Sequence, residues 1–154
     1  MPEKNAPFTM ENVMQRIIEL RGQRIMLDSD LAALYGVDTK TVIRAVKRNI
    51  LRFPKDFMFQ LNNGEWETLK SLDGAPNARG VRRFPPLAFT EHGILMLSTV
   101  LGSSRAREMN LLIIRTFVWL RQTVPVYQEA ASDLREIIAA LQRLIVSKAK
   151  KSGH

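Results

Sequence analysis

Apolar residues recur at helical spacing between residues 28 and 35. Leu31, Leu34 and Tyr35 fall at the i, i+3 and i+4 positions of one helix face, with small residues between them. Asp28 precedes them, and an aspartate at this position can accept hydrogen bonds from the unpaired amides of a first helical turn. The pattern therefore predicts a short helix from Asp28 to Tyr35 with Asp28 as its cap.

A second helical pattern begins after a glycine. Gly36 can adopt the positive φ that often follows the end of a helix, so the chain can turn within a few residues. Asp38 can then cap a helix that extends to Asn49. Apolar and basic residues occupy opposite sides of this helix. The apolar side holds Val42, Ile43, Val46 and Ile50, and the basic side holds Lys40, Arg44, Lys47 and Arg48.

Together the two segments have the features of a helix-turn-helix. Two helices that cross steeply need a small residue at their closest approach, such as Ala32, and a glycine in the turn, such as Gly36. Apolar residues that can hold such a pair together are also present, at Leu31, Val37, Val42 and Ala45. The spacing predicts a helix-turn-helix over residues 28–49.

The second helix of such a unit enters the major groove of DNA, where its early residues meet base edges. Six basic residues and no acidic residue lie between Thr39 and Lys55. An ordinary solvated helix face is the alternative, because surface helices are often charged. The cap, glycine and alanine positions favour DNA binding. We expect base contacts from Thr39, Lys40, Thr41 and Arg44, and phosphate contacts from Lys47, Arg48 and Arg52.

Three blocks of the sequence resemble one known family. They are residues 22–37, GQRIMLDSDLAALYGV, residues 47–61, KRNILRFPKDFMFQL, and residues 88–93, AFTEHG. In this order, over roughly residues 17–121, they resemble the ORF-six-N domain, a phage-associated DNA-binding domain related to KilA-N and Bro-N. The resemblance implies a small α+β DNA-binding module of phage, prophage and bacterial proteins. Such modules often carry a variable C-terminal segment and are sometimes linked to antirepressor or regulatory roles.

The remaining pattern also indicates an α+β fold. Residues 17–27 favour a β-hairpin around Gly22, although Val13, Ile17 and Leu20 also fit one helix face. Trp66 lies at helical spacing from a leucine, which favours a core position over base stacking. Asn62 or Asn63 can cap the helix that contains Trp66, and Thr90 can cap a later one. Strands are expected at 57–61 and 87–89, and helices at 65–72, 94–101 and 105–123.

Residues 73–86 contain two glycines and three prolines, a composition that does not support regular structure. The segment also carries Arg79, Arg82 and Arg83. One interpretation is a basic arm that reaches a minor groove or nearby phosphates. The other is a mobile surface loop, whose charges serve solubility. The sequence leaves both open.

A heptad pattern follows Pro125, which suits the first turn of a last helix ending near Lys148. About three heptads form only a marginal coiled coil alone, so the helix either pairs with a second copy or folds back on its own domain. We favour a homodimer, because two-fold proteins present two recognition helices to paired half-sites. The stripe consists of Tyr127, Ala131, Leu134, Ile138, Leu141 and Ile145, widened by Ile137 and Leu144, and the dimer contacts are expected from Leu134, Ile138, Leu141 and Ile145.

Composition narrows the class of partner. The chain of 154 residues has a formal net charge of +8, which favours a polyanion such as double-stranded DNA. No apolar stretch is long enough for a transmembrane helix and no signal peptide is visible, so we expect a cytoplasmic protein without a membrane partner. The sequence contains no cysteine, and His92 is its only internal histidine. We therefore expect no metal site, no cofactor, no catalytic residue and no enzymatic activity.

The expected organisation is a flexible N-terminus (1–12), an ORF-six-N-like DNA-binding domain (13–123), a C-terminal helix that can dimerise (124–148) and a basic tail (149–154). The favoured function is a dimeric transcriptional regulator of phage or prophage type. The main alternative is an antirepressor or adaptor that binds another regulatory protein. RNA binding is less favoured, because single-strand readers display exposed aromatic platforms and most aromatic residues here fall on expected core faces.

Overall fold

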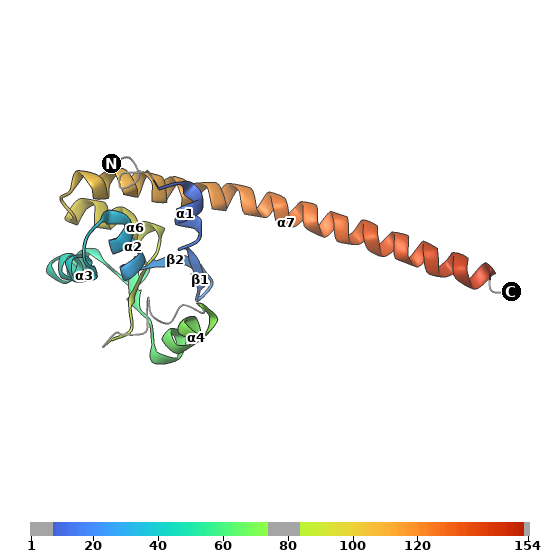
Figure 1. Cartoon of the computed structure of the whole chain (residues 1–154), viewed down its shortest axis with the longest axis horizontal. Coiled ribbons are helices and arrows are strands. Elements are labelled where there is room, and N and C mark those ends of the chain that lie inside the picture. Colours follow the sequence, from blue (N-terminus) through green and yellow to red (C-terminus); the bar gives the residue numbers. More distant parts are fainter. Residues whose placement is uncertain (1–7, 74–83, 153–154) are drawn as a thin grey trace, which may run out of the picture. The chain divides into compact units, whose positions relative to one another are not determined.

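The computed structural model describes residues 8–73 and 84–152. The internal contacts of the chain divide it into two compact units, Met1–Thr116 and Phe117–His154. The fold is α+β, as predicted. Its elements are α1 (Met10–Met14), β1 (Ile18–Leu20), β2 (Gln23–Leu27), α2 (Asp28–Tyr35), α3 (Thr39–Arg48), the 3-10 turn η2 (Ile50–Arg52), β3 (Met58–Gln60), α4 (Asn63–Asp73), β4 (Leu87–Phe89), α6 (Glu91–Val100) and α7 (Ser104–Ser152) (Figure 1).

The four strands form one antiparallel sheet in the order β1-β2-β4-β3. The predicted hairpin is confirmed, with β1 and β2 joined by Arg21 and Gly22. Both turn residues have positive φ, 52° and 74°, as a type I′ hairpin turn requires. Strand β4 lies between β2 and β3, so that Met26 and Met58 both stand opposite Phe89. Segments far apart in the sequence therefore meet at β4.

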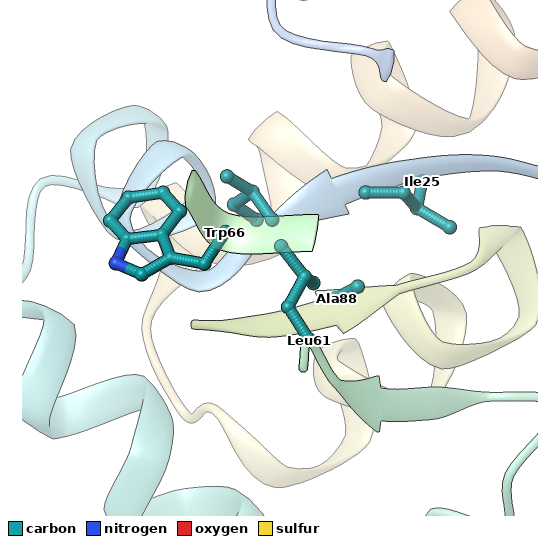
Figure 2. Packing of buried hydrophobic residues seen from close by; sticks show 5 residues of the cluster. Ile25, Leu61, Trp66 and Ala88 are labelled. Carbon is teal, nitrogen blue, oxygen red and sulfur yellow. The ribbon is translucent and has the colours of Figure 1, made fainter. Parts of the chain in front are cut away.

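One apolar cluster consists of Ile25, Leu27, Leu61, Trp66 and Ala88 (Figure 2). Trp66 is only 5 % exposed, which confirms the prediction that it belongs to the core. Asn62 caps α4: its Oδ1 accepts from the Glu65 amide at 2.7 Å, and its own amide donates to Glu65 Oε1 at 2.9 Å. This capping box confirms Asn62 as the cap and holds Trp66 near the sheet.

The side chains that alternate with this cluster along the strands point to the other face of the sheet. Met26 lies between Ile25 and Leu27 and is fully buried, as is Phe89. Helix α2 contacts β2 and β4, and α6 contacts β4 and α3. Phe53 meets Phe89 edge to face, with 6.2 Å between ring centroids. The helices that the pattern predicted as a helix-turn-helix are thus attached to the sheet core.

Two predictions about the ends of the chain were wrong. The stretch expected to be a flexible N-terminus includes the start of α1, where Thr9 and Asn12 form a reciprocal cap. Helix α7 runs from Ser104 to Ser152 with Pro125 inside it, so no new helix begins there. A proline removes a single backbone donor, and helical residues on both sides can continue through it. Ser103 caps α7 by accepting from the Ala106 amide at 3.0 Å.

Candidate nucleic-acid interface

Helix α2 begins at the predicted residue, but Asp28 is not its cap. Strand β2 runs directly into the helix, which makes Leu27 the capping residue without a side-chain hydrogen bond. Asp28 is fully buried in the first turn. Its carboxylate accepts from the Ser29 amide at 2.7 Å and from the Leu87 amide at 3.0 Å. The residue expected to cap the helix therefore also ties it to β4, a contact that sequence spacing does not reveal.

The turn between α2 and α3 is set by Gly36. Its φ of 73° and ψ of 34° lie in the left-handed region, as predicted. The Val37 amide donates to the Ala32 carbonyl at 3.0 Å and the Gly36 amide to the Ala33 carbonyl at 3.3 Å, which is a Schellman ending. Arg105 of α7 lies against this turn: a Cβ on Gly36 would lie 2.9 Å from Arg105 Nε. The backbone conformation thus requires glycine here, whereas the exposed Arg105 side chain could move away from an added Cβ.

The residues predicted to hold α2 against α3 do so. All the predicted contact residues except Val37 are buried, and Val37 is half-buried. The buried set consists of Leu31, Ala32, Val42 and Ala45, joined by Val46. This packing leaves the opposite side of α3 directed away from the core.

Exposed cations lie on α3 and continue into the residues that follow it. They are defined here as the basic surface: Lys40, Arg44, Lys47 and Arg48 of α3, Arg52 of η2 and Lys55 after it. All six side chains are exposed, and Thr41 is exposed among them while Thr39 is half-buried. None of the six forms an ion pair with any residue in the described part of the chain. Asp38 is the N-cap of α3 as predicted, but its side chain makes no capping hydrogen bond. Across residues 8–73 and 84–152, no carboxylate therefore pairs with these six cations.

The C-terminal end of this surface differs from the prediction. Helix α3 ends at Arg48, and Ile50 begins the turn η2 instead of continuing the apolar side. Ile50 is 52 % exposed and Leu51 is 96 % exposed. Leu51 lies in η2, beyond the end of α3, between the exposed cations Arg48 and Arg52 in the sequence. Sequence reasoning did not single out this exposed apolar residue.

A buried polar network connects α2 with α6 and α7. The Tyr35 hydroxyl donates to Asn110 Oδ1, and Asn110 Nδ2 donates to the Ile94 carbonyl at 3.3 Å. Burial raises the pKa of the Tyr35 hydroxyl above its ordinary value, which keeps it protonated as a donor. Arg105 Nε also donates to the Leu34 carbonyl at 3.4 Å. Asn110 and Arg105 position the helix pair, and neither was among the predicted site residues. A polar residue within the apolar face of 105–123 is the signal that points to Asn110.

The remaining residues singled out from the sequence are His92 and the arginines of residues 73–86. His92 is exposed and stacks on Phe57, with 5.5 Å between ring centroids. Across residues 8–73 and 84–152, no group of three or more metal-ligating side chains comes together. None of the helices in that part of the chain has the length and hydropathy needed to span a bilayer. Arg79, Arg82 and Arg83 belong to the segment interpreted either as a basic arm or as a mobile surface loop, and they lie outside the described residues.

The structure thus defines a small α+β domain that displays an unpaired basic helix. A family model, the ORF6N domain, matches residues 15–100. The chain belongs to the ORF6N family, which confirms the family resemblance of the sequence blocks. Comparison with curated proteins and with solved structures gives no match.

Proposed function

We propose that this protein is a DNA-binding transcriptional regulator of phage or prophage type, that it acts as a dimer, and that it is not an enzyme. In this proposal α2 and α3 form a helix-turn-helix and α3 enters the major groove. Thr39, Lys40, Thr41 and Arg44 meet base edges, while Lys47, Arg48 and Arg52 contact phosphates. The C-terminal stripe of α7 joins two copies.

The unpaired basic surface of α3 is the observation that carries this proposal. Exposed cations release condensed counterions when they neutralise phosphates, and this release drives binding to nucleic acid. The surface is also presented by a helix whose other side is buried and whose preceding turn is locked by Gly36. A rigid helix with an exposed polar side is what groove recognition requires. A protein-binding adaptor has no need of six exposed cations, four of them on one helix, that form no ion pair within the described part of the chain.

Selection from a random duplex pool at two salt concentrations tests the proposal. A palindromic motif together with a steep fall in affinity at high salt is the expected result, since each phosphate contact adds about 0.9 to the logarithmic salt slope. Retention without a motif would indicate contacts with the DNA backbone alone. If no DNA is retained, the protein instead acts as an antirepressor or adaptor that binds another regulator.

Single substitutions separate base contacts from phosphate contacts. Arg44→Ala is expected to cost about 1–3 kcal/mol on the selected site and to relax the preference at one base pair. Lys47→Ala should weaken binding to all sequences alike. It should also reduce the slope of log affinity against log salt concentration by about 0.9, the value of one phosphate contact. Arg115→Ala removes an exposed arginine of α7 away from this surface and is the matched control. Equal losses on selected and random DNA for Arg44→Ala would contradict its assignment to a base.

A further inference from the structure

The C-terminal part of α7 exposes a continuous apolar stripe. The same alternating spacing of four and three residues also occurs near the start of α7. There it selects Ala106, Asn110 and Ile113, and these three residues are buried. Farther along the helix the same pattern is exposed: Leu134 is 56 % and Ile145 is 67 % exposed. The exposed set consists of Leu134, Ile137, Ile138, Leu141, Leu144 and Ile145. Side chains of this size on consecutive turns indicate a helix surface that binds a partner.

In heptad terms, Ile138 and Ile145 occupy a positions and Leu134 and Leu141 occupy d positions. Ile137 and Leu144 then occupy g positions, which in coiled coils are commonly charged. The relative direction of two paired helices decides what a g residue meets. In a parallel pair g faces e of the partner, so Ile137 would meet Gln142. In an antiparallel pair g faces g, so Ile137 would meet Leu144.

Charge is also distributed unevenly along this segment. Glu129, Asp133 and Glu136 lie in its first half, with Arg135 as the one cation there. The second half carries Arg143 and Lys148 and no acidic residue. In the same heptad numbering Glu129, Glu136 and Arg143 occupy f positions and Asp133 a c position, on the outer side of each helix, so no acidic and basic side chains pair across the seam. At longer range, antiparallel copies place the acidic half of each chain at the level of the basic half of the other, whereas parallel copies place like halves at the same level.

We infer that the C-terminal segment of α7 binds a second copy of itself in the antiparallel direction. The inference rests on the dimer in the proposed function and specifies its geometry. The register follows from pairing each a residue with a d residue: Leu134 lies against Ile145 of the second chain, and Ile138 against Leu141. Ile137 of each chain then packs against Leu144 of the other along one edge of the helix pair. Both side chains, which are exposed in the single chain, become buried.

Disulfide trapping in the full-length chain tests the direction, because the sequence contains no cysteine and each introduced thiol is unique. Residues 134 and 145 are separated by about 16 Å along one helix, and a disulfide needs Cα atoms within about 7 Å. A mixture of the Leu134→Cys and Ile145→Cys variants should therefore form at least about tenfold more disulfide than either variant alone. Ala131→Cys with Lys148→Cys is a second pair in the same register, for use if the first pair impairs folding.

Ser132→Cys mixed with Ser147→Cys is the matched control, since both residues lie on the outer side of the helix and should not bridge. Bridging within the Leu134→Cys variant alone would show parallel helices and overturn the inference while leaving the dimer intact. A monomer by light scattering, with no bridging in any mixture, would overturn the inference and the dimer together. Retention of DNA by the unmodified protein is measured separately, so failure of DNA binding is distinguishable from both results.

Discussion

At the scale of single residues, polar side chains decide where the helices of the domain lie. Tyr35 and Asn110 are both buried, and their hydrogen bond connects α2 with α7. Asn110 also reaches the Ile94 carbonyl of α6. A buried polar group is costly when its partner is removed, because neither water nor protein then replaces the hydrogen bond. The network therefore stabilises one particular packing of α2, and with it the orientation of α3.

Tyr35→Phe tests this network. The substitution keeps the ring but removes the donor to Asn110 Oδ1, and we expect the free energy of unfolding to fall by about 1–3 kcal/mol. Urea denaturation measures the change. Trp119→Phe, at a partly exposed aromatic residue of α7, is the control and should have a much smaller effect. An unchanged midpoint for Tyr35→Phe would show that the network adds no stability.

At the scale of elements, close contacts fix how neighbouring segments meet. The start of α6 lies against the backbone of Phe57: the Thr90 amide donates to the Phe57 carbonyl at 3.0 Å, and the Thr90 side chain caps the helix through the Gly93 amide at 3.3 Å. A Cβ on Gly93 would lie 1.9 Å from the Phe57 carbonyl oxygen. This contact joins α6 to the segment that precedes β3.

Gly93→Ala should therefore be strongly destabilising. The added methyl group meets backbone atoms, which move less readily than the end of a side chain, and we expect a loss of about 2–4 kcal/mol. Thermal and urea denaturation measure it. Gly102→Ala is the matched control, because a Cβ there meets nothing within 4 Å, and its effect should stay within about 0.5 kcal/mol. Similar stabilities for the two variants would contradict the close contact.

A second link between elements joins the hairpin to α4. Arg21 binds the Glu65 carboxylate through two nitrogens, at 2.8 and 2.9 Å, while its guanidinium lies 4.1 Å from the centre of the Phe59 ring. The hydrogen bond from Arg21, followed by that from the Asn62 amide, holds the pKa of Glu65 below its usual value. The same carboxylate thus caps α4 and connects it to the hairpin turn.

The link predicts a pH dependence of stability. Because the pKa of Glu65 is lower in the folded chain than in the unfolded chain, its ionised form contributes stability above the ordinary value of 4.5. That contribution is lost as the pH falls through the lowered pKa of the folded state. Glu65→Gln should therefore be less stable at pH 7, and the difference from the parent chain should shrink towards pH 3. Glu67→Gln, at an exposed carboxylate of the same helix, is the control. A difference that does not vary with pH would contradict the assignment.

At the scale of the whole molecule, the proposed activity needs both units of the chain. The unit Met1–Thr116 contains the sheet, the helix pair and the basic surface, and Phe117–His154 contains the exposed stripe. A two-fold dimer gains affinity for paired half-sites because the second contact becomes intramolecular. The DNA affinity and the oligomeric state should therefore change together.

A chain that ends after Val124 tests this coupling. It lacks the exposed stripe, so we expect a monomer by sedimentation or light scattering, with DNA affinity reduced by about tenfold or more. Circular dichroism checks that the remaining domain is folded. The full-length Leu134→Asp/Leu141→Asp variant should also be a monomer with reduced DNA affinity. It places charges in the proposed contact between the two helices without shortening the chain. If truncated and intact proteins have the same oligomeric state, α7 is not the dimer element.

The sequence by itself determined the features that depend on neighbouring residues. The bounds of α2, the start of α3 after Asp38, the left-handed Gly36, the hairpin and the caps at Asn62 and Thr90 all follow from local spacing and backbone preference, and the structure confirms them. The basic side of α3 was readable for the same reason. Helical periodicity places side chains on faces whatever the rest of the chain does.

The tertiary structure decided what depends on distant residues. It placed Asn110 beside Tyr35, set Arg105 against Gly36 and tied Asp28 to Leu87, and each of these contacts joins residues at least 59 positions apart in the sequence. It also ended α3 before Ile50 and carried α7 through Pro125. Local preferences are small compared with the free energy of burying side chains and pairing polar groups, so packing between distant segments decides such positions.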